Sequence, residues 1–231
     1  MTTELTSAKF YNEIYKQSNY FSYHRWLYAP YIASLVAFCG LKKGNSVLDV
    51  GCGQGFFSYH FSKLGMKVHG IDVSETGIQM AEKMYGRFGV TFAVSDIQTA
   101  TFSEAFDCIF VRSCSLYNTD TFAIDTQITD KLLGYLRVDG VFIFVYNSSM
   151  FSKPSAKWRY HSLDDMRSHF RRYPCAQMFF LNKITPFLLH KYSFTSINTH
   201  FSVFLSRVLG MGGDLVCVLK SPYLASGDSA S

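Results

Sequence analysis

Three glycines at alternate positions, preceded by an acidic residue, form the segment with the clearest chemical meaning. Gly51, Gly53 and Gly55 follow a short apolar run that contains Asp49. Glycine lets the main chain approach a ligand with no side chain in between, and a loop that leads from a strand into a helix is well placed for this. A dinucleotide-binding loop needs the spacing G-x-G-x-x-G, and Phe56 breaks that register. The loop therefore indicates a closely bound ligand and differs from the dinucleotide pattern.

Two more acidic residues follow later apolar runs in the same way. Asp72 comes directly after the run 67–71, and Ser95-Asp96 follow the run 90–94. A carboxylate has two acceptor oxygens, which suit a pair of adjacent hydroxyl groups or an amine. We therefore expect these acids to contact the same ligand as the glycine loop.

The elements that would position these residues alternate along the chain. Apolar runs predict strands at 46–50, 67–71, 90–94, 106–111 and 141–146. Helical spacing predicts helices at 56–64, 74–85 and 120–136, with a turn at Asp139-Gly140 before the fifth strand. This alternation predicts an α/β domain whose parallel sheet is covered by helices on both faces.

Different patterns flank this core, which we assign to residues 41–148. Residues 1–40 predict a helical cover, 149–222 the C-terminal part of the same domain, and 223–231 a disordered tail. In the C-terminal part we expect a capped helix at 162–170, strands at 175–181 and 215–219, and an apolar helical insertion at 185–210. The insertion is read either as a lid over the site or as an interface.

The motifs resemble those of the class I S-adenosylmethionine-dependent methyltransferases. Val47-Leu-Asp-Val-Gly-Cys-Gly-Gln-Gly55 is similar to the family's first motif, and the resemblance continues through Asp72, Ser95-Asp96-Ile97 and Phe106-Asp107. It implies a Rossmann-like fold with a mostly parallel seven-stranded sheet, an N-terminal helical cover and a helical insertion before the last strand. It also implies the cofactor S-adenosyl-L-methionine, with S-adenosyl-L-homocysteine as its product.

The resemblance implies a role for each residue at the strand ends. Asp49 would face the cofactor's ammonium group, and Asp72 would bind both ribose hydroxyls. Asp96 and the amide of Ile97 would address the adenine, with Val73 and Ile97 on its two faces. The full set implied to bind the cofactor is Asp49, Gly51, Cys52, Gly53, Gly55, Asp72, Val73, Ser95, Asp96, Ile97 and Arg112.

Several of these residues also have a purely structural reading. Asp49 could be a buried structural acid, although an unpaired buried carboxylate is costly. Asp72 could cap the following helix, for which Ser74 is the better candidate. Asp96 could form a turn, and Arg112 is read equally as a pocket residue or as a surface-facing strand end.

Catalysis in this family resembles an in-line displacement, which depends on holding the reacting groups close together in a dry cavity. A catalytic side chain is then not obligatory, although an oxygen nucleophile benefits from a proton acceptor. Our candidate catalytic residues are His161, beyond the fifth strand, and Tyr117, after the fourth. Tyr11, Tyr15 and Tyr20 in the N-terminal cover are further candidates to line the methyl site.

The residues after the fourth predicted strand narrow the choice of acceptor. Val111–Ser115 lacks the Asn/Asp-Pro-Pro-Tyr/Phe motif of family members that methylate planar amines and nucleobases, and no acid–amide pair for a metal follows. We therefore expect a small organic acceptor, with oxygen favoured, and no metal. Basic residues between Lys153 and Arg172 favour an anionic acceptor, and their aromatic neighbours an aromatic one.

The net charge of +5 is unevenly distributed and leaves two alternatives open. Residues 1–150 carry 12 Lys/Arg and 13 Asp/Glu, a balance of −1, whereas residues 151–231 carry 10 and 4, a balance of +6. A basic third with interleaved aromatics is compatible with RNA methylation, although we do not expect nucleic acid as the partner. The other alternative is a non-catalytic methyltransferase-like scaffold. A homodimer is also left open.

Composition places the chain among globular domains. Its 231 residues are 48% hydrophobic and 17% charged, enough apolar material for a core. The six cysteines form no C-x-x-C pair, and the sequence shows neither a signal segment nor an apolar stretch long enough for a membrane span. We expect a cytoplasmic protein with reduced thiols, without a disulfide framework or structural zinc.

Overall fold

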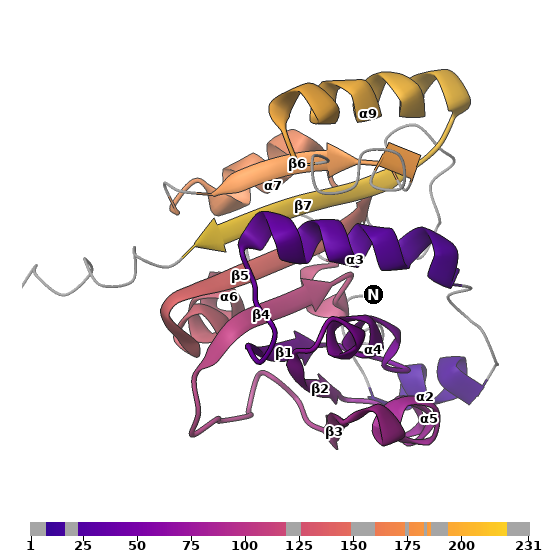
Figure 1. Cartoon of the computed structure of the whole chain (residues 1–231), viewed down its shortest axis with the longest axis vertical. Coiled ribbons are helices and arrows are strands. Elements are labelled where there is room, and N and C mark those ends of the chain that lie inside the picture. The colour runs from indigo at the N-terminus through magenta and orange to yellow at the C-terminus, as the bar shows by residue number, and fades with distance from the viewer. Residues whose placement is uncertain are drawn as a thin grey trace, which may run out of the picture.

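The protein folds around a single seven-stranded sheet. The computed structural model describes residues 8–16, 23–118, 126–148, 160–173, 176–182, 184–185 and 194–220. The strand order is β3-β2-β1-β4-β5-β7-β6 (Figure 1). The strands are β1 (Ser46–Val50), β2 (Lys67–Asp72), β3 (Val90–Val94), β4 (Phe106–Arg112), β5 (Leu136–Ser148), β6 (Gln177–Leu181) and β7 (Gly213–Lys220). The first five pair in parallel, whereas β7 runs antiparallel to both β5 and β6. The expected α/β fold with a mostly parallel seven-stranded sheet is confirmed.

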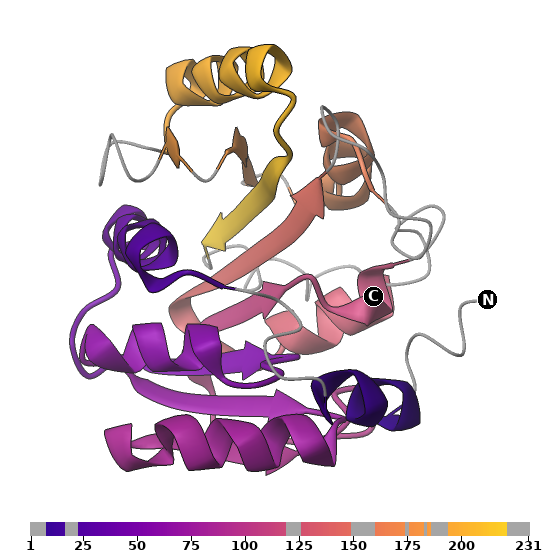
Figure 2. The same cartoon turned by 90° about the vertical axis from the view of Figure 1, so that its right-hand side faces the viewer.

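Helices cover both faces of the sheet, because the central strands are apolar along their whole length. One apolar layer lies beneath α3 (Arg25–Cys39) and α4 (Phe56–Lys63). The other lies beneath α6 (Thr126–Leu133) and α7 (Leu163–Phe170) (Figure 2). With its two faces covered, the sheet exposes its functional groups at the carboxyl ends of the strands.

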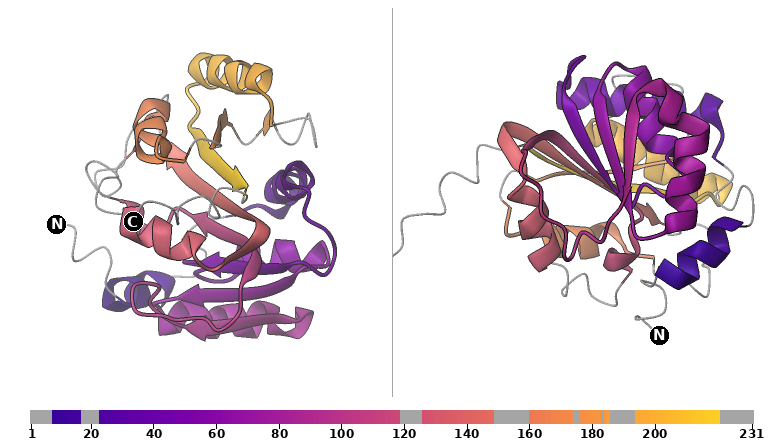
Figure 3. Two further views of the ribbon diagram at one scale, coloured as in Figure 1. Left: turned by 90° about the vertical axis from the view of Figure 1, so that its left-hand side faces the viewer. Right: turned by 90° about the horizontal axis from the view of Figure 1, so that it is seen from below.

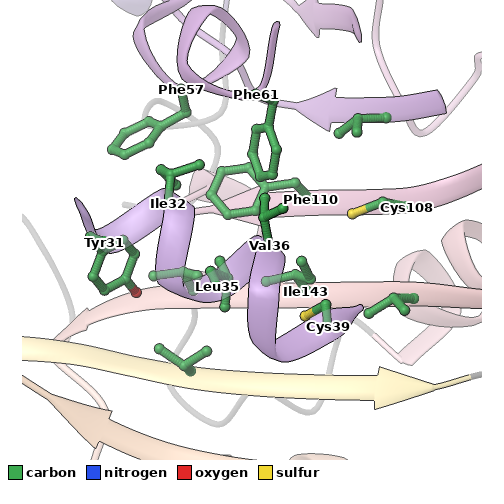
Figure 4. Packing of buried hydrophobic residues seen from close by; sticks show 14 of the residues in the cluster. Tyr31, Ile32, Leu35, Val36, Cys39, Phe57, Phe61, Cys108, Phe110 and Ile143 are labelled. Carbon is green, nitrogen blue, oxygen red and sulfur yellow. The ribbon is translucent and has the colours of Figure 1, made fainter. Parts of the chain in front are cut away.

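Helix α3 forms the largest part of the first layer. Its residues are apolar around almost the whole circumference, and Ile32 and Leu35 are fully buried. Ile32 and the buried Val36 face Phe57 and Phe61 of α4 and Phe110 of β4 (Figure 4). This packing fixes α4, and with it the loop that precedes α4.

The turn predicted at Asp139-Gly140 is wrong, because these residues lie inside β5. Phe106 of β4 pairs with Leu136, and the next pair is Cys108 with Val141, so β5 advances five residues while β4 advances two. Asp139 takes a left-handed conformation with φ of 64°, which Asp tolerates better than most residues. The Asp139-Gly140 pair therefore marks a β-bulge inside β5 and does not end the strand. Of the predicted helix 120–136, residues 126–133 form α6 and 119–125 lie outside the described residues; its predicted end is wrong, because Leu136 already belongs to β5.

The N-terminal and C-terminal segments largely follow the expected elements. α2 (Ala8–Lys16) lies against α5 (Glu75–Tyr85), as the indigo and magenta helices of Figure 3 show. The capping box at Ser162 and Asp165 starts α7 as predicted. α9 (Ser196–Leu209) represents the apolar insertion and packs on β6. The predicted tail 223–231 lies outside the described residues, and the division into four parts stays a prediction.

Within the described part of the chain, none of the helices combines the length and the apolar character needed to cross a bilayer.

Candidate functional site

A cavity of about 470 Å³ lies at the carboxyl ends of the parallel strands. This volume falls in the range of about 300–1,000 Å³ that is usual for small-molecule sites. Ten of the eleven residues predicted to bind the cofactor line it, namely Asp49, Gly51, Cys52, Gly53, Asp72, Val73, Ser95, Asp96, Ile97 and Arg112. The structure therefore brings together residues that come from the ends of four different strands.

The loop after β1 presents its main chain to this cavity. Gly51 and Gly53 have φ of 72° and 54°, values that favour glycine. A Cβ atom on Gly53 would come within 2.7 Å of the Tyr15 hydroxyl. Gly55 differs from the other two, because it is absent from the cavity lining and a Cβ there would meet Phe92 at 2.7 Å. Gly55 therefore has a structural role, because it precedes the first residue of α4 and lies against Phe92 of β3.

Asp72 is held by two main-chain N–H groups. The amide of Gly53 donates to one carboxylate oxygen at 2.8 Å, and the amide of Ser74 donates to the other at 2.9 Å. Ser74 itself caps α5 by accepting from Gly77 at 3.0 Å. Burial raises the pKa of Asp72, which these two hydrogen bonds counteract. Asp72 thus fixes the glycine loop to the start of α5, and each oxygen keeps a lone pair for a further donor.

Asp49 lies deeper and has a hydroxyl partner. It is 2% exposed, and Ser58 of α4 donates to it at 2.5 Å. Burial raises its pKa to about 7, and the hydrogen bond from Ser58 acts in the opposite direction. Among the described residues no cation lies within ion-pair distance of Asp49 or Asp72. The loop therefore brings two buried acids to the cavity wall without a positive partner.

The segment after β3 lies across the cavity from the loop. Asp96 accepts a hydrogen bond from the Gln98 amide at 2.9 Å, which is the turn-forming role considered from the sequence. It lines the cavity as well, together with Val73 and the buried Ile97. Cys52 is buried beside Gly70 and lines the cavity, and burial raises the pKa of its thiol.

Arg112 lies at the centre of a polar cluster on the other side of the cavity. Its guanidinium donates to Tyr23 Oη at 3.2 Å, to Asn147 Oδ1 at 3.1 Å and to Asp214 at 3.2 Å. It also lies 4.7 Å from the centre of the Phe57 ring. Burial alone would lower the pKa of Arg112, but Asp214 raises it. Arg112 is therefore a buried residue of the cavity wall, and the reading as a surface-facing strand end is excluded.

The sequence analysis missed the three partners of Arg112. Tyr23 precedes α3, Asn147 is the next-to-last residue of β5, and Asp214 belongs to β7, where it is 1% exposed. Only Asp214 could have been noticed in the sequence, because it lies near the start of an otherwise apolar strand. A buried carboxylate needs a partner, so its position indicates a polar contact.

Ser113, which follows β4, lines the cavity in a strained conformation. Its φ is 47° although it is not a glycine. Its hydroxyl oxygen is buried and has no hydrogen-bond partner among the described residues. An unsatisfied buried hydroxyl beside a cavity indicates a place where a ligand atom can complete the hydrogen bonding.

Helix α2 places aromatic rings over the cavity. Tyr11 and Tyr15 line it, as expected of the N-terminal cover, and Tyr15 is buried. Asn12 holds the helix in place by accepting from the Ser74 hydroxyl at 2.7 Å and from the Thr76 amide at 3.1 Å. Tyr20 lies outside the described residues.

Neither predicted catalytic residue lines the cavity. Tyr117 is fully buried, and its hydroxyl lies 2.9 Å from that of Thr129. His161 is 2% exposed, with its ring 5.1 Å from that of Tyr146. Tyr160, the neighbour of His161, does line the cavity. The catalytic roles of Tyr117 and His161 stay untested predictions, and their placement gives them no direct access to this cavity.

Comparisons with known proteins agree with the fold. The profile of a family described as "Methyltransferase domain" matches residues 41–183, more than half of the chain. A probable cobalt-precorrin-6B C(15)-methyltransferase of Saccharolobus solfataricus is 29% identical over 119 residues, which are 48% of this chain and 59% of that protein. A ubiquinone biosynthesis O-methyltransferase of Actinobacillus pleuropneumoniae is 32% identical over 109 residues, 44% of this chain and 45% of that protein. The chain thus spans about half the length of these curated relatives.

Solved structures share the fold at low sequence identity. Phosphoethanolamine N-methyltransferase 2 of Haemonchus contortus, in complex with S-adenosyl-L-methionine, superposes with a TM-score of 0.60 at 18% identity, covering 92% of this chain and 60% of that one. The plantazolicin methyltransferase BpumL superposes with a TM-score of 0.61 at 19% identity, covering 95% and 96% of the two chains. With the profile match and the glycine loop between β1 and α4, these findings establish that the chain belongs to the class I S-adenosylmethionine-dependent methyltransferase family.

Proposed function

We propose that the protein transfers a methyl group from S-adenosyl-L-methionine to a small organic acceptor, with oxygen as the favoured methylated atom. When bound, the cofactor supplies a methyl group on a positively charged sulfur. The observation that carries the proposal is a cavity wall of glycine main chain with two buried acids that have no cationic partner among the described residues. A ligand with an ammonium group and a diol supplies what these acids lack.

The residues fit the cofactor in three separate places. Asp72, already fixed by two amides, keeps lone pairs for the two ribose hydroxyls. Asp49 would accept from the ammonium group, which also favours its charged form. Asp96 and the amide of Ile97 would bind the adenine, with Val73 and Ile97 as its apolar contacts.

The cluster around Arg112 would form the acceptor side of the cavity. Arg112 is already paired with Asp214, so its charge is largely neutralised and its hydrogen bonds fix Tyr23 and Asn147. Tyr23, Asn147 and Ser113 then offer polar atoms to an acceptor hydroxyl. In an in-line displacement the acceptor oxygen bonds to the methyl carbon as the carbon–sulfur bond breaks, and the hydroxyl proton leaves to a neighbouring oxygen or to water.

An amine acceptor is the second candidate. The phosphoethanolamine N-methyltransferase 2 superposes about as well as the plantazolicin methyltransferase does, with TM-scores of 0.60 and 0.61. The attacked atom therefore has to be identified by experiment.

Two measurements test the proposal. Calorimetry with S-adenosyl-L-methionine and S-adenosyl-L-homocysteine should show binding by the wild type, much weaker binding by Asp72→Ala, and unchanged binding by Glu82→Ala, which removes an exposed acid of α5. A labelled-methyl screen over hydroxylated and amine-bearing small molecules, with RNA as a separate arm, should then give a methylated small product. Absence of cofactor binding would favour the non-catalytic scaffold, and methylation of RNA alone would replace the proposed acceptor class.

A further inference from the structure

The outward face of α9 is apolar in a way that the rest of the surface is not. Five large apolar side chains of this helix, the apolar stripe, are 42–79% exposed: Ile197, Phe201, Phe204, Val208 and Leu209. The first four lie at positions i, i+4, i+7 and i+11, so they share one side of the helix. Scattered exposed apolar residues are ordinary, but a contiguous row of this kind marks an interaction surface.

The inward face of α9 is polar, so the helix is reversed relative to an ordinary surface helix. Thr199, Ser202 and Ser206 are buried against the protein. The hydroxyl of Ser202 lies 2.7 Å from that of Thr185, and Asn182 donates to the Ser202 carbonyl at 3.4 Å. Hydrogen bonds of Ser202 and packing of Val203 therefore attach α9 to the domain, whereas the five side chains of the apolar stripe remain exposed.

The charge on α9 itself is basic, since its sequence contains Arg207 and no acidic residue. From Met166 to Gly213 the sequence contains six Lys/Arg and no Asp/Glu, and two of these, Arg167 and Arg172, are paired with Asp164 and Asp130. Arg207 is exposed on α9 itself, and Arg171 is exposed at the end of α7. Figure 2 shows α9 and α7 on either side of the β6 edge, at one end of the molecule. An apolar row with a basic surround is complementary to an anionic lipid surface.

The same charge distribution disfavours a second copy of the chain as the occupant. A symmetric dimer through the apolar stripe would pair the same patch with itself. Two acid-free basic segments would then approach each other, and no carboxylate of α9 could pair with the Arg207 of the other copy.

We propose that the apolar stripe of α9 docks on the surface of a lipid bilayer that contains anionic lipids. The helix lies along the surface and inserts Phe201 and Phe204 between the head groups, while Arg207 faces lipid phosphates. α9 leads into β7, whose first residue Gly213 pairs with Ser148 at the end of β5. A short segment therefore connects α9 to the carboxyl edge of the sheet, where the cavity lies. Docking of α9 would bring this edge close to the membrane.

Vesicle sedimentation tests this proposal on the full chain. Phosphatidylcholine vesicles with phosphatidylserine should bind the protein, pure phosphatidylcholine vesicles should bind it weakly, and added salt should reduce the binding. Phe201→Ser/Phe204→Ser should lower the partition by at least about tenfold, because both rings lose apolar burial. Arg207→Gln should lower it by about fivefold.

A matched control and two further measurements make the outcomes decisive. Met84→Ser/Val138→Ser removes two exposed apolar side chains elsewhere and should bind vesicles like the wild type. Equal vesicle binding by the wild type and the Phe201/Phe204 variant, or no binding to anionic vesicles, would overturn the proposal. A dimer in sedimentation velocity that this variant dissociates would overturn it in favour of a second copy. Calorimetry with S-adenosyl-L-methionine should give the same affinity for all variants, so failure of the proposed enzymatic function is seen separately.

Discussion

The two sides of the cavity hold buried carboxylates in opposite ways. At the ends of β1 and β2, Asp49 and Asp72 accept hydrogen bonds from a hydroxyl and from main-chain amides, and in the described part of the chain no cation pairs with either. At the ends of β4 and β7, Asp214 is paired with the guanidinium of Arg112 at 3.2 Å. All three acids are less than a tenth exposed.

This difference in pairing indicates which buried carboxylates can still gain stabilisation from a ligand. A buried carboxylate without a cation is incompletely stabilised and gains when a cationic or hydroxylated ligand arrives. A buried carboxylate with an arginine is already neutralised, and it stabilises the protein only as long as its partner remains. Under the proposed function Asp49 and Asp72 bind the ligand, whereas Asp214 is paired with Arg112 and fixes the opposite wall.

Breaking the pair of Arg112 and Asp214 should have the largest effect. Arg112→Met leaves the buried Asp214 without its cation and should reduce the free energy of unfolding by about 3–5 kcal/mol. Denaturant unfolding measures this loss. The double variant Arg112→Met/Asp214→Leu removes both charges and should be more stable than the single variant. A double variant as unstable as the single one would show that packing, rather than charge, explains the loss.

Removing the charge of Asp72 should have the next largest effect, on binding rather than on folding alone. Asp72→Asn keeps the shape but replaces one acceptor oxygen by an amide group, which cannot accept from the Gly53 or Ser74 amide. We expect S-adenosyl-L-methionine affinity to fall by about 1–3 kcal/mol. Calorimetry against Glu82→Gln, an exposed acid of α5, provides the comparison, and equal affinities would contradict the ribose assignment.

The raised pKa of Asp49 predicts a smaller, pH-dependent effect. With its pKa at about 7 in the folded protein, Asp49 holds a proton that the unfolded chain has lost above about pH 4. Stability should therefore fall by about 1–2 kcal/mol as the pH rises from about 6 to 8, because the folded protein releases the proton of Asp49 in this range. Asp49→Asn should remove that part of the pH dependence. Unfolding curves of both proteins without cofactor test it, and parallel pH profiles would refute the assignment to Asp49.

The exposed ion pair of Arg137 with Asp107 should matter least. Its two side chains are 51% and 22% exposed, and solvent screens their attraction. Arg137→Ala should change the free energy of unfolding by less than about 1 kcal/mol. A loss similar to that of Arg112→Met would mean that burial is not what distinguishes the two pairs.

The cofactor side of the cavity could be predicted from the sequence because its signals are local. Each of the first three strands is short and mainly apolar, and Asp49, Asp72 and Asp96 lie within two residues of a strand end. In parallel strands these ends meet at one edge of the sheet, so sequence order alone placed the residues together. The bulge at Asp139 was mistaken for a turn because both use the same local conformation.

The acceptor side could not be predicted because its contacts are distant in the sequence. Arg112 and Asp214 are 102 positions apart, and Arg112 and Tyr23 are 89 apart. Which residues meet there depends on the antiparallel register of β7 and on the segment before α3, neither of which a local pattern defines. The candidate His161 shows how precisely a sequence pattern can place a side chain. The prediction missed by one residue, because Tyr160 lines the cavity and His161 does not.

The strained backbone at Ser113 has a consequence for selection experiments. Glycine adopts a φ of 47° without the penalty of about 1–2 kcal/mol that a side chain brings there. A library of variants screened only for heat resistance should therefore enrich Ser113→Gly, whereas a library screened for turnover should retain the hydroxyl. The divergence of the two populations at this codon would reveal what the enzyme gains from keeping a serine in a position that suits glycine.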